Sequence, residues 1–247
     1  MVQAWPTRPV LAQANLSANC QLNALLRARQ AHNSTVGTSK EGPLPSSTGG
    51  VVSLSALFVK ALAISLAQVP AANVVLAGDR LIRQTHCDIA FARSSLDGRV
   101  DFPSLVDAHL KAAWDITREL NTLMAVEGDP ASSSLEAQLK GVNDRKPTAA
   151  IANLGRGAVS SYQTPLSPSH ATVIAIPSAT PRLVPPVAAD LNQGALAPVQ
   201  DWHSVMNLEI TLGCDTRMMS GVIAADLLET FIAQLEQPEH LFAERLF

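Results

Sequence analysis

Hydrophobic and polar residues alternate between residues 205 and 214, and this period of two predicts a half-buried β-strand. The run from 221 to 236 follows at once and carries apolar residues four apart, which places them on one line of a helix. These residues are Ile223, Leu227, Phe231 and Leu235. A polar turn, "LGCDTRMMSG" at 212–221, joins the two predicted elements. Such turns between apolar elements are frequent places for an active site.

The most apolar run of the chain lies between Val51 and Val69. It is interrupted by Lys60 and several serines, and Pro70 ends it. Because a membrane span needs about 20 clean apolar residues, this shorter run predicts a buried helix instead. Ser53 stands where a helix N-cap is expected.

The remaining pattern predicts one α+β domain over residues 1–247, with a mixed sheet and packed helices. We expect strands at about 9–20, 87–95, 148–155 and 171–179, and a hairpin with irregular edges over 180–199. Helices are expected at 21–30 and, from the spacing of apolar residues, from Pro103 to about Val126, with one or two further turns near 134–141. Residues 33–50 have the composition of a flexible loop, and "DG" at 97–98 indicates a turn.

Composition and charge exclude some classes of function. Hydrophobic residues make up 47% of the 247 positions, so we expect a packed core and apolar surface that is buried between subunits. The net charge of −3 and the isoelectric point near 6.0 give no electrostatic case for binding nucleic acid or an anionic membrane.

The three cysteines, Cys20, Cys87 and Cys214, are far apart in the sequence. This spacing suggests neither a zinc site nor a disulfide framework, and it favours a reducing compartment. We therefore expect no metal and no cofactor. No signal or transit peptide opens the chain, so an imported protein would be present here as a processed form or a fragment.

The order of these segments resembles the catalytic domain of the dihydrolipoamide acyltransferases of 2-oxo-acid dehydrogenase complexes, whose fold is shared with chloramphenicol acetyltransferase. The matching pieces are "SLSALFVKALAISLAQVPAAN", "HCDIAFARSSLDG", "AAIANLG", "SHATVIAIPSATPR" and "MNLEITLGCDTRMMSGVIAADLLETFIAQLEQPE". They run in the family's order from about residue 51 onward. The resemblance implies a chloramphenicol acetyltransferase-like fold and a trimer with its sites between subunits.

In active members of this family the turn before the last helix reads DHRxxDG, and a second motif reads SNLG. The resemblance implies that the histidine is the general base for a substrate thiol, that the aspartate orients the site, and that the serine donates to the oxyanion. Here these positions are Thr216, Ser220 and Ala152. The frame around them is kept, as Asp215, Arg217, Gly221, Asn153 and Gly155, and Ser220 is expected to cap the last helix as an aspartate would.

The substitutions favour a non-catalytic member of the family, whose divergence is closest to that expected of a fungal form. The resemblance then implies a homotrimeric anchoring domain in the mitochondrial matrix. It would dock on or inside the acyltransferase core of the pyruvate dehydrogenase complex. Lipoyl and dehydrogenase-binding modules, which would hold dihydrolipoamide dehydrogenase, would lie outside this chain.

Two alternatives remain open at the level of sequence. One is a divergent but active acyltransferase that uses coenzyme A and a relocated base such as His170. The other is a binding protein of the same fold outside any oxo-acid complex. Arg217 is expected to be a structural ion-pair partner, the six histidines to be structural, and Met218 and Met219 to be packing residues that plug the old substrate channel.

The C-terminal "EHLFAERLF" makes an apolar tip of Leu241, Phe242, Leu246 and Phe247. It can fold back on its own subunit, or it can link trimers, as the corresponding tip does in the acyltransferases that the chain resembles. The sequence does not decide between these two possibilities.

Overall fold

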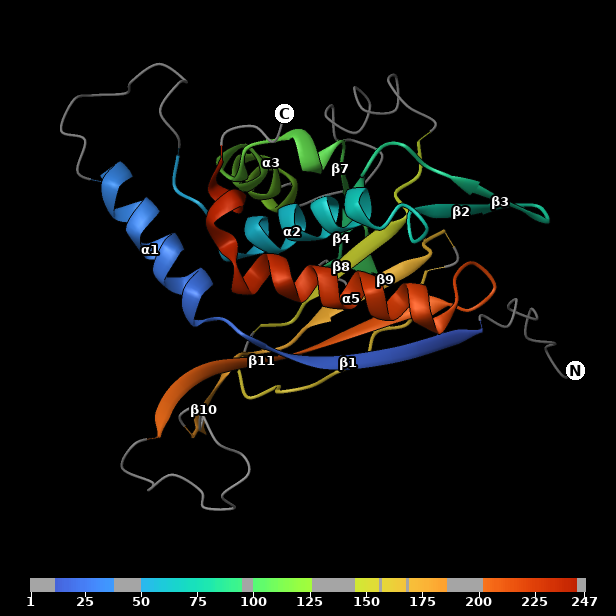
Figure 1. Ribbon diagram of the computed structural model, residues 1–247. Helices are drawn as coiled ribbons and strands as arrows, with labels where there is room; N and C mark the ends of the chain where they lie inside the picture. The colour runs from blue at the N-terminus through green and yellow to red at the C-terminus, as the bar shows by residue number, and fades with distance from the viewer. Residues whose placement is uncertain are drawn as a thin grey trace, which may run out of the picture.

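The computed structural model describes residues 12–37, 50–94, 100–125, 145–155, 157–167, 169–185 and 202–243. A seven-stranded mixed sheet runs through the molecule, and helices cover one of its faces (Figure 1). The strand order is β1-β11-β9-β8-β4-β7, with β10 paired to β11. The fold is therefore α+β, as predicted. None of the helices in the described residues is long and apolar enough to cross a membrane.

The centre of the sheet is parallel and its edges are antiparallel. β4 (Ile89–Phe91), β8 (Ala149–Asn153) and β9 (Thr172–Ile176) run parallel to one another. β11 (His203–Asp215) is antiparallel to β9 and to β1 (Gln13–Gln21). Short strands complete the outer parts of the sheet, namely β7 (Ser104–Leu105) beside β4 and β10 (Thr180–Val184) beside β11.

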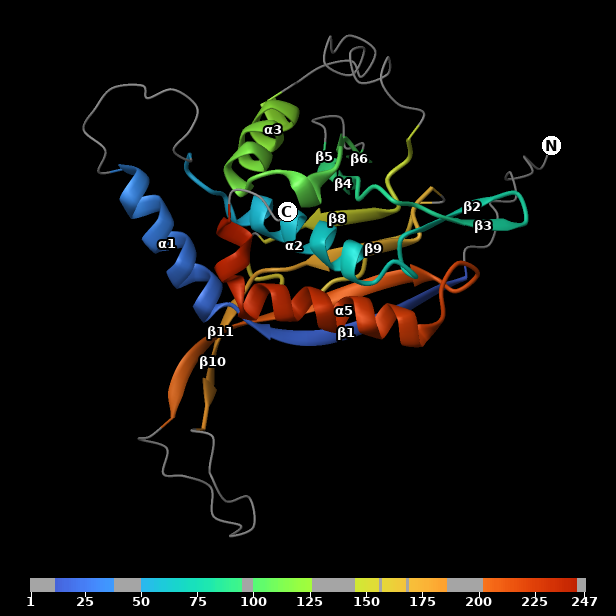
Figure 2. The ribbon, with the colours of Figure 1, turned by 45° about the horizontal axis from the view of Figure 1, so that its top comes forward.

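Two helices predicted from the sequence form the centre of the covering layer. α2 (Leu54–Gln68) begins where predicted, because the Ser53 side chain accepts a hydrogen bond from the Ala56 amide at 3.2 Å. α5 (Gly221–Glu236) packs against α2 and β1, with Leu227, Phe231 and Leu235 fully buried. α3 (Ala113–Ala125) lies on the other side of α2 (Figure 2).

The prediction of one helix over 103–126 is wrong for residues 103–112. Residues 104–105 form β7, and a 3-10 helix, η1 (Ala108–Leu110), follows before α3 begins. The break lies at Asp107, whose φ of 47° belongs to the left-handed region, so a continuous helix cannot pass through it. Leu105 fits the helical spacing of apolar residues and is buried, but it belongs to a strand.

The first residues of the loop predicted over 33–50 are helical instead. α1 (Asn23–Gly37) continues through Asn33, whose side chain accepts from the Val52 amide and donates to the Val52 carbonyl. These contacts across the chain stabilise helical turns that composition alone would not favour. Residues 38–49 lie outside the described residues, as do the turn expected at 97–98, the turns near 134–141 and most of the 180–199 hairpin. Its described part, β10, pairs with β11, and the pairing expected within 180–199 stays a prediction.

The remaining elements are small. β2 (Val74–Ala77) and β3 (Arg80–Arg83) form a hairpin that the sequence reading missed, and β5 (Arg93–Ser94) pairs with β6 (Val100–Asp101). A 3-10 helix, η4 (Pro238–Phe242), follows α5.

Candidate functional site

The turn after β11 is built around a buried carboxylate. Asp215 is the last residue of β11 and is fully buried. Its carboxylate accepts from the backbone amide of Arg217 at 2.9 Å and from Arg217 Nε at 3.0 and 3.1 Å. These hydrogen bonds from the Arg217 side chain hold the pKa of the Asp215 carboxyl below its ordinary value. Both residues of the predicted structural pair therefore serve to close the turn.

Thr216 lies between them and faces the start of β1. Its backbone amide and its hydroxyl both donate to the Ala12 carbonyl, each at 2.8 Å. A threonine hydroxyl cannot act as a base near neutral pH, and this one is engaged with the backbone. The position thus joins two strands of the sheet.

Ser220 caps α5, as predicted. Its backbone is extended, and its hydroxyl accepts from the Ile223 amide at 3.4 Å. Met218 and Met219, which precede it, are buried in the main hydrophobic core. They are packing residues, as expected; their role as a plug of a channel between subunits stays a prediction. Gly221 opens the helix, and nothing lies within 4 Å of the place that a Cβ would take.

Ala152 lies near the end of β8 that is farther from Thr216. In register, Ala152 is level with Ala175 of β9, and Ala175 is level with Thr211 of β11. Thr216 lies five residues further along, a separation of about 16 Å at the usual rise of a strand. One chain therefore does not bring Ala152 together with Thr216 and Ser220, and only a contact between chains could do so.

The residues next to Ala152 have structural partners. Asn153 donates to the Ser55 hydroxyl at 3.0 Å and accepts from the Gly155 amide at 2.9 Å, so it ties the end of β8 to the start of α2. The Tyr162 hydroxyl donates to the Ala152 carbonyl, and burial raises the pKa of Tyr162 to about 12. Neither group is free to serve a substrate in this arrangement.

His170, the candidate for a relocated base, does lie beside the turn. It precedes Ala171, whose carbonyl accepts from the Asp215 amide at 3.0 Å. The His170 ring is 3% exposed and meets the Phe102 ring edge-on at a centroid distance of 5.5 Å. Its Nδ1 has no partner among the described residues. Burial lowers the pKa of His170 to about 4, so the ring is a weak base.

The other histidines have the surroundings of structural residues. Burial lowers the pKa of His109 and of His240. The His240 ring is hydrogen-bonded to Gln234, and the His32 ring lies 5.4 Å from that of Phe242. His203 is exposed on β11. The last of the six, His86, is near a charge cluster that the sequence reading missed.

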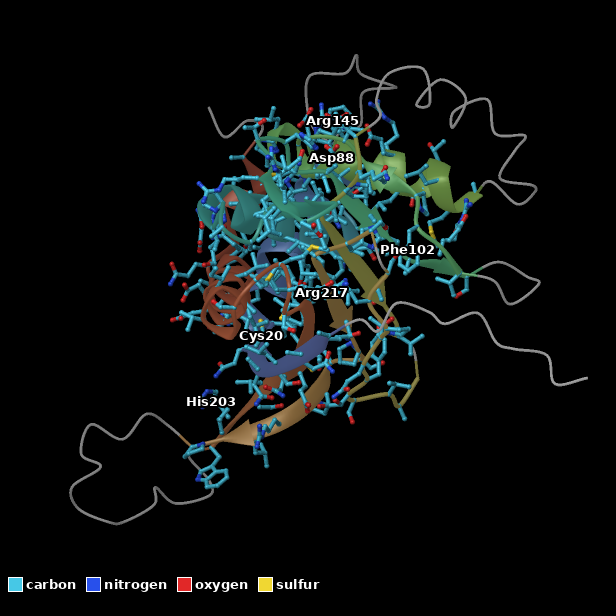
Figure 3. The ribbon with its side chains drawn as sticks, turned by 90° about the vertical axis from the view of Figure 1, so that its right-hand side faces the viewer. Cys20, Asp88, Phe102, Arg145, His203 and Arg217 are labelled. Atoms are coloured by element: carbon cyan, nitrogen blue, oxygen red, sulfur yellow. The ribbon has the colours of Figure 1, made fainter. Side chains whose placement is uncertain are left out.

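That cluster joins Asp88, Asp107 and Arg145. Arg145 Nη2 lies 3.0 Å from Asp88 Oδ1 and 2.7 Å from Asp107 Oδ1, and His86 Nε2 lies 3.7 Å from Asp88 Oδ2. Figure 3 shows Asp88 and Arg145 together, apart from Arg217. No motif or spacing marked these residues, because Asp88 and Arg145 are 57 positions apart in the sequence and meet only in the fold. Among the described residues no group of His, Cys, Asp and Glu could hold a metal ion.

The apolar tip folds back onto its own chain as far as it is described. Leu241 is fully buried in η4, and Phe242 packs against the core. The Lys60 ammonium donates to the Ala243 carbonyl at 3.1 Å from the middle of α2. Leu246 and Phe247 lie outside the described residues.

Comparison with known proteins gives a consistent result. The family model of the 2-oxoacid dehydrogenases acyltransferase (catalytic domain) matches residues 1–243. The acetyltransferase component of the pyruvate dehydrogenase complex of Rhizobium meliloti is 26% identical over 223 residues, which are 90% of this chain and 44% of that protein. The mitochondrial component of Caenorhabditis elegans is 26% identical over 224 residues, 90% of this chain and 39% of that protein. The chain thus spans about two-fifths of the length of these relatives.

Solved structures show the same fold. The cubic core of a pyruvate dehydrogenase multienzyme complex matches with a TM-score of 0.70 at 18% identity, covering 95% of this chain and 85% of that one. A dihydrolipoamide acetyltransferase of Azotobacter vinelandii matches with a TM-score of 0.69 at 18% identity, over 95% and 85% of the two chains. In that protein a serine, a histidine and an asparagine were investigated for their role in the catalytic mechanism. Chloramphenicol acetyltransferase matches with a TM-score of 0.53 at 12% identity, over 92% and 88%. The predicted fold class is confirmed.

Proposed function

Because the chain belongs to the 2-oxoacid dehydrogenase acyltransferase (catalytic domain) family, we propose that it is a non-catalytic assembly domain of a pyruvate dehydrogenase complex. It would correspond to protein X, the component that binds dihydrolipoamide dehydrogenase. The observation that carries this proposal is Thr216, which stands at the position of the family's histidine and donates its hydroxyl to the Ala12 carbonyl.

The chemistry of acyl transfer to a thiol explains the weight of this substitution. A thiol with a pKa of about 8.5 needs a partner that titrates near neutrality. Thr216 has no such group, and the Asp215 carboxylate is a poor base because Arg217 lowers its pKa. Loss of a positioned base costs about 10²–10⁴-fold in rate. Ala152 also lacks a hydroxyl for the oxyanion, a loss of about 10²–10³-fold in comparable sites.

The parts of the site that make structure are intact, which supports a role in assembly. The ion pair of Asp215 with Arg217 closes the turn, Ser220 caps α5, and Asn153 fixes the end of β8. The proposed domain forms a homotrimer in the mitochondrial matrix and docks on or inside the acyltransferase core. It holds dihydrolipoamide dehydrogenase near the core through segments outside this chain. Two relatives named as acetyltransferase components of pyruvate dehydrogenase complexes support this context.

The alternative to a non-catalytic assembly domain is an enzyme, namely a divergent but active acyltransferase. His170 lies next to the turn as a relocated base would, but its ring is 3% exposed and its pKa is lowered to about 4. A base of that pKa holds a thiol proton poorly, so this observation counts against the alternative. The fold is also compatible with a binding protein outside any oxo-acid complex.

Co-sedimentation tests the assembly role directly. The purified domain is mixed with an assembled pyruvate dehydrogenase acyltransferase core and centrifuged, with an unrelated protein of similar mass as the control. We expect the domain to pellet with the core and native mass spectrometry to give a trimer of the free domain. Failure to pellet would favour the binding protein outside the complex.

A further inference from the structure

The β2–β3 hairpin extends away from the body of the molecule in both ribbon views (Figures 1 and 2). Its two-residue turn is Gly78-Asp79, and Gly78 has a φ of +61°, as type II′ hairpin turns require at their first central residue. β2 and β3 pack chiefly against each other. A two-stranded ribbon of this kind is marginally stable in water unless something covers it.

The base of the hairpin is held firmly by the core. The Asn73 side chain is buried and donates to the carbonyls of Gln84 and His86 at 3.2 and 2.9 Å. It accepts in turn from the Thr148 hydroxyl at 2.5 Å. The Gln84 amide donates to the Asn73 carbonyl at 2.8 Å. The hairpin is therefore a ribbon with a fixed direction.

Each face of the ribbon carries apolar side chains and one arginine. The register places Ile82 opposite Val75 beside Arg80 on one face, and Leu81 opposite Leu76 beside Arg83 on the other. Leu81 is 50% exposed and Ile82 is 46% exposed. Arg80 and Arg83 are exposed, and neither forms an ion pair within the described residues. Exposed apolar groups on both faces indicate a surface that is covered in an assembly.

The outer face of α5 has the complementary character. α5 contains no basic residue, and Asp226 and Glu229 are exposed one turn apart on it. Val222, one turn before Asp226, is 71% exposed, more than any other large apolar residue in the described part of the chain. Asp226 and Glu229 also form no ion pair within the described residues. The face thus offers an apolar contact followed by two free carboxylates.

We propose that the β2–β3 hairpin of one copy docks on the outer face of α5 in a second copy of this chain. Arg80 and Arg83 would pair with Asp226 and Glu229, and the apolar side chains of the ribbon would cover Val222. Because the two patches differ, the contact is head-to-tail, and such contacts form closed rings when the rotation between copies allows it. The inference rests on the proposed trimer and deepens it by naming residues of its interface.

A charge-swap experiment tests this contact. Sedimentation velocity is measured over a concentration series for the wild type and for the variant with Arg80→Glu and Arg83→Glu. Like charges across an interface are strongly unfavourable, so we expect association of this variant to weaken by at least about tenfold. Adding Asp226→Arg and Glu229→Arg in the same chain reverses both sides of every contact and should restore association to within about threefold.

The matched control carries Arg27→Glu and Arg182→Glu, which change the charge equally at exposed sites elsewhere. It should associate as the wild type does, and circular dichroism should show every variant folded. An unchanged trimer in the hairpin variant, no recovery in the fourfold variant, or an equal loss in the control would each overturn the inference while leaving the trimer in place. A wild type that is monomeric at every concentration would instead remove the proposed trimer itself.

Discussion

Arg217 folds back onto Asp215, two residues before it, so that Arg217 Nε lies 3.0 and 3.1 Å from the two carboxylate oxygens. The carboxylate is fully buried, while the arginine side chain is 41% exposed. This pair is the anchor of the turn that holds Thr216, the position at which the resemblance places the family's histidine. The geometry of the turn therefore does not depend on any catalytic group.

Replacing Asp215 by alanine should destabilise the domain. The substitution removes the acceptor for the amide and side chain of Arg217, and a broken buried pair costs several kcal/mol when both charges are buried. Since Arg217 is partly exposed, we expect a loss of about 2 kcal/mol in the free energy of unfolding, measured by urea titration. Thr216→Ala is the control, with an expected loss of about 1 kcal/mol for a single neutral hydrogen bond. Equal losses in the two variants would contradict the anchoring role.

His170 should make the domain sensitive to mild acid. Its pKa is about 4 when folded and about 6.5 when unfolded, so the unfolded state binds the proton first as the pH falls. The contribution of the neutral ring is complete above pH 6.5 and is lost between pH 6.5 and 4, by up to about 3 kcal/mol. Urea titrations at several pH values should show this slope in the wild type and a shallower one in His170→Leu. Parallel slopes for the two proteins would contradict it.

Lys60 should oppose folding at neutral pH. Burial lowers the pKa of its ammonium from 10.5 to about 8, so the unfolded state holds the proton more tightly between these values. Stability should therefore rise as the pH increases from 8 to 10.5. Lys60→Met removes the buried charge, and we expect it to raise the free energy of unfolding at pH 7 by about 1–3 kcal/mol. Lys111→Met, at a partly exposed lysine, serves as the control. A destabilised Lys60→Met at pH 7 would show that the bond to the Ala243 carbonyl outweighs desolvation.

Introducing the family's residues one at a time should not give acyltransferase activity. Thr216→His supplies a base, Ser220→Asp keeps a capping residue, and Ala152→Ser supplies an oxyanion donor. Groups that act as a unit have non-additive effects, so we expect transacetylation above background only in the triple variant. Activity of Thr216→His alone at the level of the triple variant would show that the rest of the site is still competent.

The sequence predicted the elements whose signals are local. Ser53 and Ser220 cap their helices as expected, the apolar run of α2 is buried, and so are Leu227, Phe231 and Leu235 on the line predicted for α5. It failed where tertiary contacts decide. Asp107 in a left-handed conformation divides the predicted helix over 103–126, and Asn33 is held in α1 by its bonds to Val52. The cluster around Arg145 had no signal at all, because its partners come from distant parts of the chain.

The functional positions show the same division. Thr216, Ser220 and Ala152 were recognisable only beside a known motif, and the sequence could not show that Thr216 and Ala152 lie about 16 Å apart along the strands of one chain. The sequence did not decide whether the C-terminal tip folds back on its own chain or links trimers. Leu241 is buried because η4 packs against α5 and against α1 and α2, which are distant from it in the sequence.

The proposed assembly role implies that this domain does not transfer acyl groups. The most direct measurement is a transacetylation assay with acetyl-CoA and dihydrolipoamide, run beside the catalytic domain of an intact acetyltransferase component. Loss of the base alone predicts turnover at least about 10²-fold below that enzyme, and the combined losses predict none above background. Turnover within about tenfold of the intact enzyme would contradict the claim.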